Sequence, residues 1–117
     1  MEIKNDLIYF NEIPIGLFAL RPDGQIIETN NYFNQIFETI QKKTNFYQLF
    51  VSPESSLAWQ SLLEIDEILT SFEAQFYNAN HQIIWVEINS LKVKNTFNQV
   101  FFYVGTIQNI SKRKESQ

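Results

Sequence analysis

The spacing of hydrophobic residues changes several times in the first 30 positions, and each change marks an expected element. Residues 2–10 place apolar side chains at helical intervals, which predicts a short amphipathic helix. An apolar run over residues 16–21 has the length of a strand, and residues 25–29 resume as a second strand. Between them, Pro22-Asp23-Gly24 favours a tight turn, because Pro and Asp suit its early positions and Gly tolerates a positive φ. The sequence therefore predicts an opening helix followed by a hairpin.

Helical segments are expected between residues 30 and 65. Asn30 can cap the first helix, since its side-chain oxygen can accept from free amides of the first turn. Residues 46–51 predict one further helical turn, and Ser52-Pro53 marks the start of the last helix, where Pro is well suited to the first position. One face of the first helix is expected to carry Phe33, Ile36, Phe37 and Ile40. The buried stripe of the last helix is expected to contain Ala58, Leu62 and Ile65, with Trp59 and Leu63 beside them.

From Leu69 onward, apolar and polar residues alternate as they do in half-buried strands. Two strands are predicted, one on either side of a turn at residues 78–81. Their expected core-facing residues are Phe72, Ala74 and Phe76 on the first strand, and Ile84, Val86 and Ile88 on the second. Leu91 and Val93 continue the second strand with the alternation shifted by one residue. That shift predicts a β-bulge near Asn89-Ser90.

Residues 100–110 predict a long last strand that is apolar on both faces. One face is expected to carry Phe101, Tyr103 and Ile107, and the other Val100, Phe102 and Val104. A strand covered on both sides is either central in its sheet or part of an interface between chains.

The order of elements is helix, two strands, short helices and three strands, which indicates an α+β fold. We expect a five-stranded antiparallel sheet with short helices packed on one face and an N-terminal flanking helix. A chain of 117 residues suits one hydrophobic core. The expected division is a flanking helix over residues 1–12, a domain over residues 13–111, and the polar start of a linker to a further domain over residues 112–117.

Charge and composition narrow the function. A net charge of -4 disfavours nucleic-acid binding, which needs a concentrated basic face. The absence of Cys excludes a disulfide, a thiolate nucleophile and Cys-ligated zinc or iron–sulfur sites. The sequence shows no leader pattern and no stretch of about 20 apolar residues. We therefore expect a cytoplasmic domain, with any membrane anchor of the parent protein outside this sequence.

Side chains suited to catalysis or metal binding are sparse. The single His, His81, falls in an expected turn, whereas a transition-metal site usually gathers several ligands. Four carboxylates, Asp66, Glu67, Glu73 and Glu87, are expected to be scattered on polar faces, so no acid pair or triad is predicted. We expect no catalytic residues and no metal site, and hence no enzymatic activity in this domain.

Three segments of the chain resemble the PAS domain family. Residues 13–37 are similar to its opening hairpin, with an Asp-Gly turn and an Asn before the helix. Residues 73–93 resemble its paired strands, with Trp85 in an Ile-Trp-Val-Glu sequence, and residues 103–115 resemble its closing strand and exit motif. The resemblance implies a PAS-like fold. It also implies a sensory role in signal transduction, with an attached effector such as a histidine kinase or a diguanylate cyclase.

The exit motif departs from the family pattern. Asn109, Ile110 and Ser111 stand where the family usually has Asp-Ile-Thr, and in the family the acidic residue often couples the sheet to the outgoing helix. Asn can donate and accept hydrogen bonds but cannot form an ion pair. The substitution implies either altered coupling at this signal exit or neutral drift at a tolerant position.

The resemblance also raises the question of a cofactor. Flavin adducts and thioester-linked chromophores of PAS domains both require a Cys, which this chain lacks. Haem-binding relatives commonly use a His on a helix beside the pocket, whereas His81 is expected in a turn. We expect no cofactor.

The interior between sheet and helices is the remaining candidate site. The side chains expected there are Phe33, Phe37, Phe46, Leu49, Phe50, Leu62, Phe76, Trp85 and Ile88. They either line a cavity for a small apolar or aromatic ligand or fill the core at ordinary density, and the number of bulky rings favours the second reading.

Two functions of different class follow from these readings. One is a ligand sensor. The other is a ligand-free relay that forms a homodimer through the N-terminal helix and the outer sheet face. A small enzyme with an acid-lined cavity is the weakest alternative.

Overall fold

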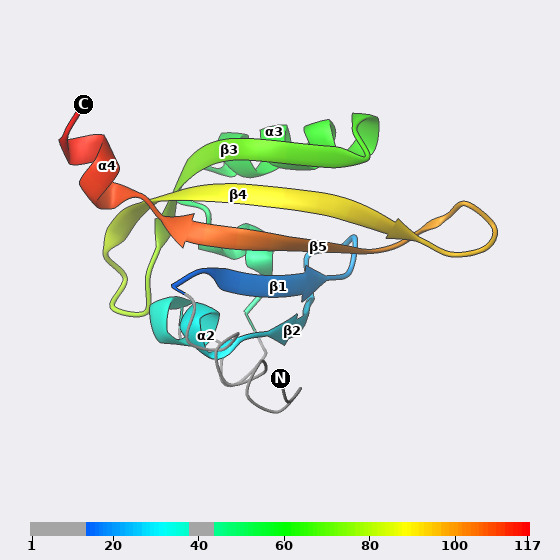
Figure 1. Ribbon diagram of the computed structural model, residues 1–117, viewed down its shortest axis with the longest axis horizontal. Coiled ribbons are helices and arrows are strands. Elements are labelled where there is room, and N and C mark those ends of the chain that lie inside the picture. Colours follow the sequence, from blue (N-terminus) through cyan, green and yellow to red (C-terminus); the bar gives the residue numbers. More distant parts are fainter. Residues whose placement is uncertain (1–13, 38–43) are drawn as a thin grey trace, which may run out of the picture.

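The computed structural model describes residues 14–37 and 44–117 and contains one antiparallel sheet of five strands (Figure 1). The strands are β1 (Gly16–Leu20), β2 (Ile26–Thr29), β3 (Ile68–Tyr77), β4 (Ile83–Lys94) and β5 (Val100–Asn109). The helices are α2 (Asn31–Phe37), the 3-10 helix η1 (Phe46–Leu49), α3 (Pro53–Ile65) and α4 (Ser111–Glu115). The predicted α+β fold is confirmed. The helix predicted at residues 2–10, and with it the flanking part of an interface, lies outside the described residues, as does Ile40.

The strand order is β2-β1-β5-β4-β3, so the last strand is central, which is one of the two alternatives that its apolar faces left open. In Figure 1 the sheet faces the viewer and α3 lies behind β3 and β4. The face that carries the core is therefore the far face, and the near face is called the outer face below.

Asn30 joins three elements at the start of the fold. Its Oδ1 accepts from the amides of Phe33 (3.0 Å) and Leu17 (2.9 Å), and its Nδ2 donates to the carbonyl of Ile15 (2.9 Å). The first bond is the predicted N-cap of α2, and the other two tie the cap to the start of β1. The side chain is buried, so these bonds replace water for an amide that would otherwise be unsatisfied.

The buried stripe predicted for α3 is correct for Trp59 and Leu63 and wrong for Ala58, Leu62 and Ile65. Trp59 and Leu63 are fully buried and Ser56 is buried beside them, whereas Ala58 is exposed, Leu62 is half-buried and Ile65 is 77% exposed. Successive residues of a helix point about 100° apart, so a shift of one position turns one stripe away from the core. The structure shows which stripe is inward: the indole of Trp59 packs beside η1, with its ring centre 5.2 Å from that of Phe46.

The β-bulge predicted near Asn89-Ser90 lies opposite them, in β3. The pairing of β4 with β5 runs unbroken through both residues, while Leu69 pairs with Ser90 and Phe72 pairs with Ile88. The extra residue is therefore in β3, where Ser71 has φ 57° and donates its amide to Asn89 Oδ1 (2.9 Å). The shift in the sequence arose because a polar residue, Ser90, occupies a buried position of β4.

A second bulge changes the facing of β5 at its start. Val93 pairs with Phe102 and Lys94 with Val100, which leaves Phe101 as the extra residue. Phe101 is 63% exposed, and Val100 packs against the core. The prediction that Phe101 shares the face of Tyr103 and that Val100 shares the other is therefore wrong.

No helix within residues 14–37 and 44–117 combines the length and apolarity needed to cross a bilayer.

Candidate functional site

The structure brings most of the predicted interior residues into one buried cluster. Each of the following is at most 9% exposed and belongs to that cluster: Phe33, Phe37, Phe46, Leu49, Phe50, Phe76 and Ile88. They come from α2, η1 and its C-cap residue Phe50, β3 and β4, so the cluster lies between the helices and the sheet. Its composition is apolar and strongly aromatic, as the sequence indicated.

Phe46 is the centre of this cluster, and rings surround it closely. Its ring centre lies 4.7 Å from that of Phe18, 5.2 Å from Trp59 and 5.5 Å from Phe76. Phe50 and Phe33 follow at 6.0 and 6.4 Å. Aromatic rings in direct contact have centres about 4.5–7 Å apart, so these side chains fill the space around Phe46. The geometry supports the filled-core reading of the interior.

Two predicted interior residues lie elsewhere. Trp85 sits between buried Ile84 and Val86 on β4, and because alternate strand residues point to opposite faces, its ring is on the outer face, half-buried. Lys114 Nζ lies 4.6 Å from the centre of that ring. Leu62 is half-buried on α3, turned away by the shift of stripe described above. Both placements correct the sequence-based assignment.

Two buried polar atoms lack hydrogen-bond partners within residues 14–37 and 44–117: Trp59 Nε1 and Ser90 Oγ. Both belong to residues near the ring of Phe18, which lies 6.5 Å from the Trp59 ring centre to centre and packs on Gly105, the partner of Ser90 in β5. A buried polar group without a partner loses its hydrogen bonds to water, so native structures contain few of them. Sequence reasoning missed Ser90 because its position resembled a change of strand facing.

Two buried or half-buried tyrosines, Tyr47 and Tyr103, stay uncharged, and Tyr47 packs against the ring of Trp59. Tyr47 donates its hydroxyl to the carbonyl of Pro22 (2.6 Å). Burial raises the pKa of Tyr47 well above its usual range, and burial also raises the pKa of Tyr103. Both phenols are therefore neutral hydroxyls at physiological pH.

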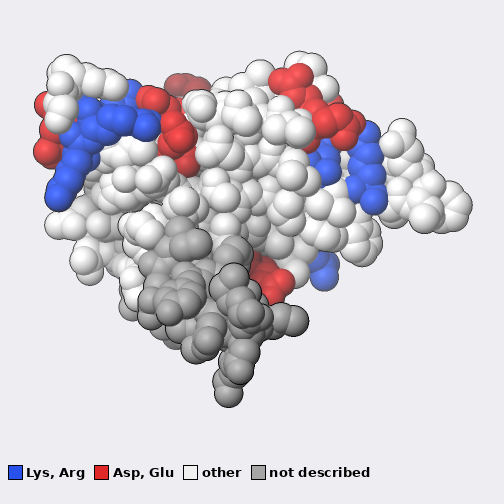
Figure 2. All heavy atoms as spheres, in the orientation of Figure 1, with Lys and Arg blue, Asp and Glu red and all other residues white. Residues whose placement is uncertain are grey.

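The outer face of the sheet carries several hollows. A groove of about 720 Å³ is lined by Ala19, Ile27, Phe101 and Phe102 and by the charged residues Arg21, Asp23 and Glu28, and a second hollow of about 410 Å³ has an uncharged lining that includes Leu17, Ile68, Leu91 and Val104. Several of these side chains are exposed, with Ile27 at 42% and Leu91 at 40%. Figure 2 shows charged side chains at the upper left and upper right of this face and a smaller charged group beside the grey atoms, with uncharged surface between them.

The predicted signal exit forms a compact junction with β4. Ile110 is buried, and its amide donates to the carbonyl of Trp85 (2.8 Å). The amide of Trp85 donates to Ser111 Oγ (3.0 Å). Asn109 Oδ1 accepts from the amide of Ser111 (3.0 Å), so this side chain bonds within the exit segment.

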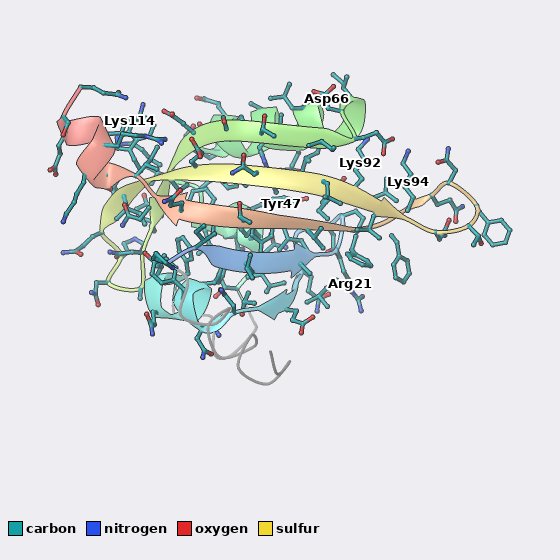
Figure 3. The ribbon with its side chains drawn as sticks, in the orientation of Figure 1. Arg21, Tyr47, Asp66, Lys92, Lys94 and Lys114 are labelled. Carbon is teal, nitrogen blue, oxygen red and sulfur yellow. The ribbon has the colours of Figure 1, made fainter. Side chains whose placement is uncertain are left out.

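Beyond this junction the chain forms α4, where the sequence predicted the polar start of a linker. The sequence predicted that Glu73 and Glu87 are scattered, but they lie directly opposite each other in the register of β3 and β4. Arg113 Nη2 lies 2.9 Å from Glu87 Oε2 and 3.6 Å from Glu73 Oε2, and Lys114 Nζ lies 2.5 Å from Glu73 Oε1. The hydrogen bond from Lys114 lowers the pKa of Glu73 below its usual value, with the charges of Lys114 and Arg113 adding to the effect. Figure 3 shows Lys114 at this end of the sheet and the pair-forming Lys94 at the other.

His81 is placed in the predicted turn, where its ring stacks on that of Tyr77 at 4.3 Å. In the part of the chain that the structure describes, no three His, Asp or Glu side chains are grouped closely enough to hold a metal ion.

Known proteins share the fold of this chain. A family model described as a PAS domain matches residues 14–112. The crystal structure of the PAS domain of a protein from Colwellia psychrerythraea is similar with a TM-score of 0.77 at 18% identity, over 95% of this chain and 98% of that one. A PAS domain from a two-component sensor histidine kinase has a TM-score of 0.71 at 16% identity, over 91% and 94%. A sensory box histidine kinase/response regulator from Burkholderia thailandensis E264 reaches 0.67 at 12% identity, over 96% and 88%. No curated protein sequence matches the chain.

Proposed function

The chain belongs to the PAS domain family, and on that premise we propose that it relays a signal to an attached effector as a pair of identical copies. In this role the domain carries out no catalysis itself. The signal reaches the effector through the exit of β5 and α4. Because similar structures include a PAS domain from a sensor histidine kinase, a histidine kinase is the first effector class to consider, with a diguanylate cyclase as the second.

The uncharged middle of the outer face is the observation that carries this proposal. An antiparallel sheet that faces water usually presents polar residues on its wet side. Here Leu17, Leu91 and Val104 line a hollow on that side, around the central strand β5. A second copy provides a matching surface, because a two-fold axis lets one patch cover itself. Residues 109–111 follow directly from β5, so a movement of the sheet of one copy relative to that of the other also moves this exit segment.

Two matched substitutions test this proposal. Leu91 is 40% exposed on the outer face, and Leu57 is 62% exposed on α3. We expect the chain to sediment as a dimer, Leu91→Lys to sediment as a monomer, and Leu57→Lys to remain a dimer. The two variants carry the same chemical change on different faces. A dimer that survives Leu91→Lys, or a wild-type chain that stays monomeric at high concentration, would contradict the proposal.

A ligand sensor is the second candidate, and the unpaired Trp59 Nε1 and Ser90 Oγ favour it. A small apolar molecule with a hydrogen-bond acceptor would satisfy the indole N–H, and a polar hydrogen would suit the hydroxyl. The close packing around Phe46 argues for the relay without a ligand. Mass analysis of small molecules released from the purified chain on denaturation distinguishes the two, since only the sensor releases a stoichiometric compound.

A further inference from the structure

We propose that the groove on the outer face, between the β1–β2 turn and the start of β5, binds a small zwitterion with an apolar body, such as a free aromatic amino acid. The body of the ligand contacts the apolar lining of the groove, and its two charges are paired by Arg21 and Glu28. This inference goes beyond the relay function, because it gives the outer face a ligand that the relay does not require.

Two β-bulges build the apolar part of the groove. The register of β1 with β2 leaves Ile27 as an extra residue of β2, and Phe101 is the extra residue of β5. Since β2 and β5 are the two neighbours of β1, the bulges lie on either side of the same strand. A bulge redirects a side chain, and here Ile27 and Phe101 line one groove while staying 42% and 63% exposed. An apolar ligand would remove this surface from water.

The dimensions of the groove suit a small molecule. Its volume of about 720 Å³ is within the range of ligand pockets. The rings of Phe101 and Phe102 have centres 5.2 Å apart and planes tilted by 58°, so they form an aromatic wall on one side. An aromatic ring of the ligand can pack against this wall in the tilted or offset arrangements that aromatic pairs prefer.

The charges at the groove select a zwitterion. The side chains of Arg21 and Glu28 have no hydrogen-bond or ion-pair partner within residues 14–37 and 44–117, whereas Asp23 Oδ1 already accepts from the amide of Gln25 (3.0 Å). Glu28 lies opposite Ala19, and Arg21 follows two positions later on the same side of the chain, just beyond the end of β1 (Figure 3). One free cation and one free anion therefore start from neighbouring positions. An α-amino acid, whose two charges share one carbon atom, is complementary to both.

The turn that forms one wall of the groove is held in place by η1 and its cap. Tyr47 donates its hydroxyl to the carbonyl of Pro22 (2.6 Å), and Asn45 Nδ2 donates to the carbonyl of Asp23 (2.9 Å). A Cβ at Gly24, whose φ is 91°, would collide with Asn45 Oδ1, so the turn and the cap are in close contact. A preformed wall lowers the cost of ordering the site when a ligand binds.

Titration of the whole chain with L-phenylalanine, followed by NMR chemical shifts of the backbone amides, tests the site. Shifts are expected at residues 19–28 and 101–102, with a Kd of about 1 mM, because the groove is open to solvent. At this affinity the purified chain retains no bound amino acid. Phenethylamine lacks the carboxylate and 3-phenylpropanoate lacks the ammonium group, so each should bind about tenfold more weakly.

Two variants assign the charges. Arg21→Gln should weaken L-phenylalanine about tenfold and leave phenethylamine unchanged, and Glu28→Gln should weaken L-phenylalanine and leave 3-phenylpropanoate unchanged. The matched control is Glu54→Gln, which removes an exposed carboxylate on α3 and should change none of these affinities.

Three results would overturn the proposal. They are an absence of shifts at residues 19–28 when L-phenylalanine is about tenfold above the expected Kd, binding of either single-charge compound as tight as that of L-phenylalanine, and an unchanged affinity in both Gln variants. Leu91 lies outside the groove, so Leu91→Lys should bind L-phenylalanine as the wild type does. Failure of the relay proposal and failure of this one are therefore distinguishable.

Discussion

The most informative perturbation of the core is Phe46→Ala. Phe46 is fully buried, and rings of Phe18, Trp59 and Phe76 lie within 5.5 Å of it, centre to centre. Removing the ring withdraws its apolar surface and leaves a cavity whose walls are other rigid rings. Truncating a buried Phe to Ala lowers the free energy of unfolding by about 3–5 kcal/mol, and limited collapse of these walls favours the upper part of that range.

Urea titration followed by circular dichroism measures this loss. Because small domains have a total stability of only about 5–15 kcal/mol, the variant can be partly unfolded without denaturant. Phe46→Leu keeps most of the apolar volume and is expected to lose less than about half as much, which keeps the measurement within range. The control is Phe101→Ala, because Phe101 is 63% exposed and its removal should change stability by less than about 0.5 kcal/mol. A loss below about 1.5 kcal/mol for Phe46→Ala would show that the interior is not filled as described.

Further predictions test other parts of the structure. Trp59→Ala should lower the free energy of unfolding by about 3–5 kcal/mol and Trp85→Ala by less than about 1.5 kcal/mol, and the reverse order in urea titration would contradict the assigned facing of β4. Asn30→Ala removes three hydrogen bonds of a buried amide and should lose about 2–3 kcal/mol, whereas the same change at exposed Asn31 should lose less than about 0.5 kcal/mol; equal losses would refute the role of the cap. The pKa of Glu73 is lowered by pairing, so the ion pair of Glu73 with Lys114 should be complete above the ordinary value of 4.5 and lost as the pH falls through the lowered value. An NMR titration should place the Glu73 pKa below 4.5 and Lys114→Gln should bring it back toward that value; a wild-type pKa at or above 4.5 would refute the pairing.

Much of the fold follows from local signals in the sequence. Asn30 and Ser52 cap α2 and α3 as predicted, because each signal needs only the residues of the first helical turn. Alternation placed Ala74, Phe76, Val86 and Ile88 on the core face of β3 and β4. The apolar character of both faces of residues 100–110 indicated either a central strand or an interface between chains, and the strand is central.

The predictions were wrong where the face of the sheet that a side chain occupies depends on residues distant in the sequence. Trp85 was assigned to the interior for its size, although Ile84 and Val86 hold the core positions on either side of it. Ser90 looked like a shift of register because a buried hydroxyl breaks the apolar pattern without breaking the strand. The pairing of Glu73 with Glu87 depends on the register of two strands and on a bulge at Ser71, neither of which a sequence pattern specifies.

The short helix α4 at the start of the predicted linker had no signal of its own in the sequence, because residues 112–117 carry no apolar period. A short helix can form at such a place when charged partners on another element hold it, and here those partners lie about 26–41 positions earlier in the chain.

Native mass spectrometry of the purified chain tests the central claim most directly. The relay account predicts a species at twice the chain mass of 13.9 kDa with no additional mass. A species at the mass of one chain over the whole concentration range, or a dimer that carries a stoichiometric small molecule, would contradict it.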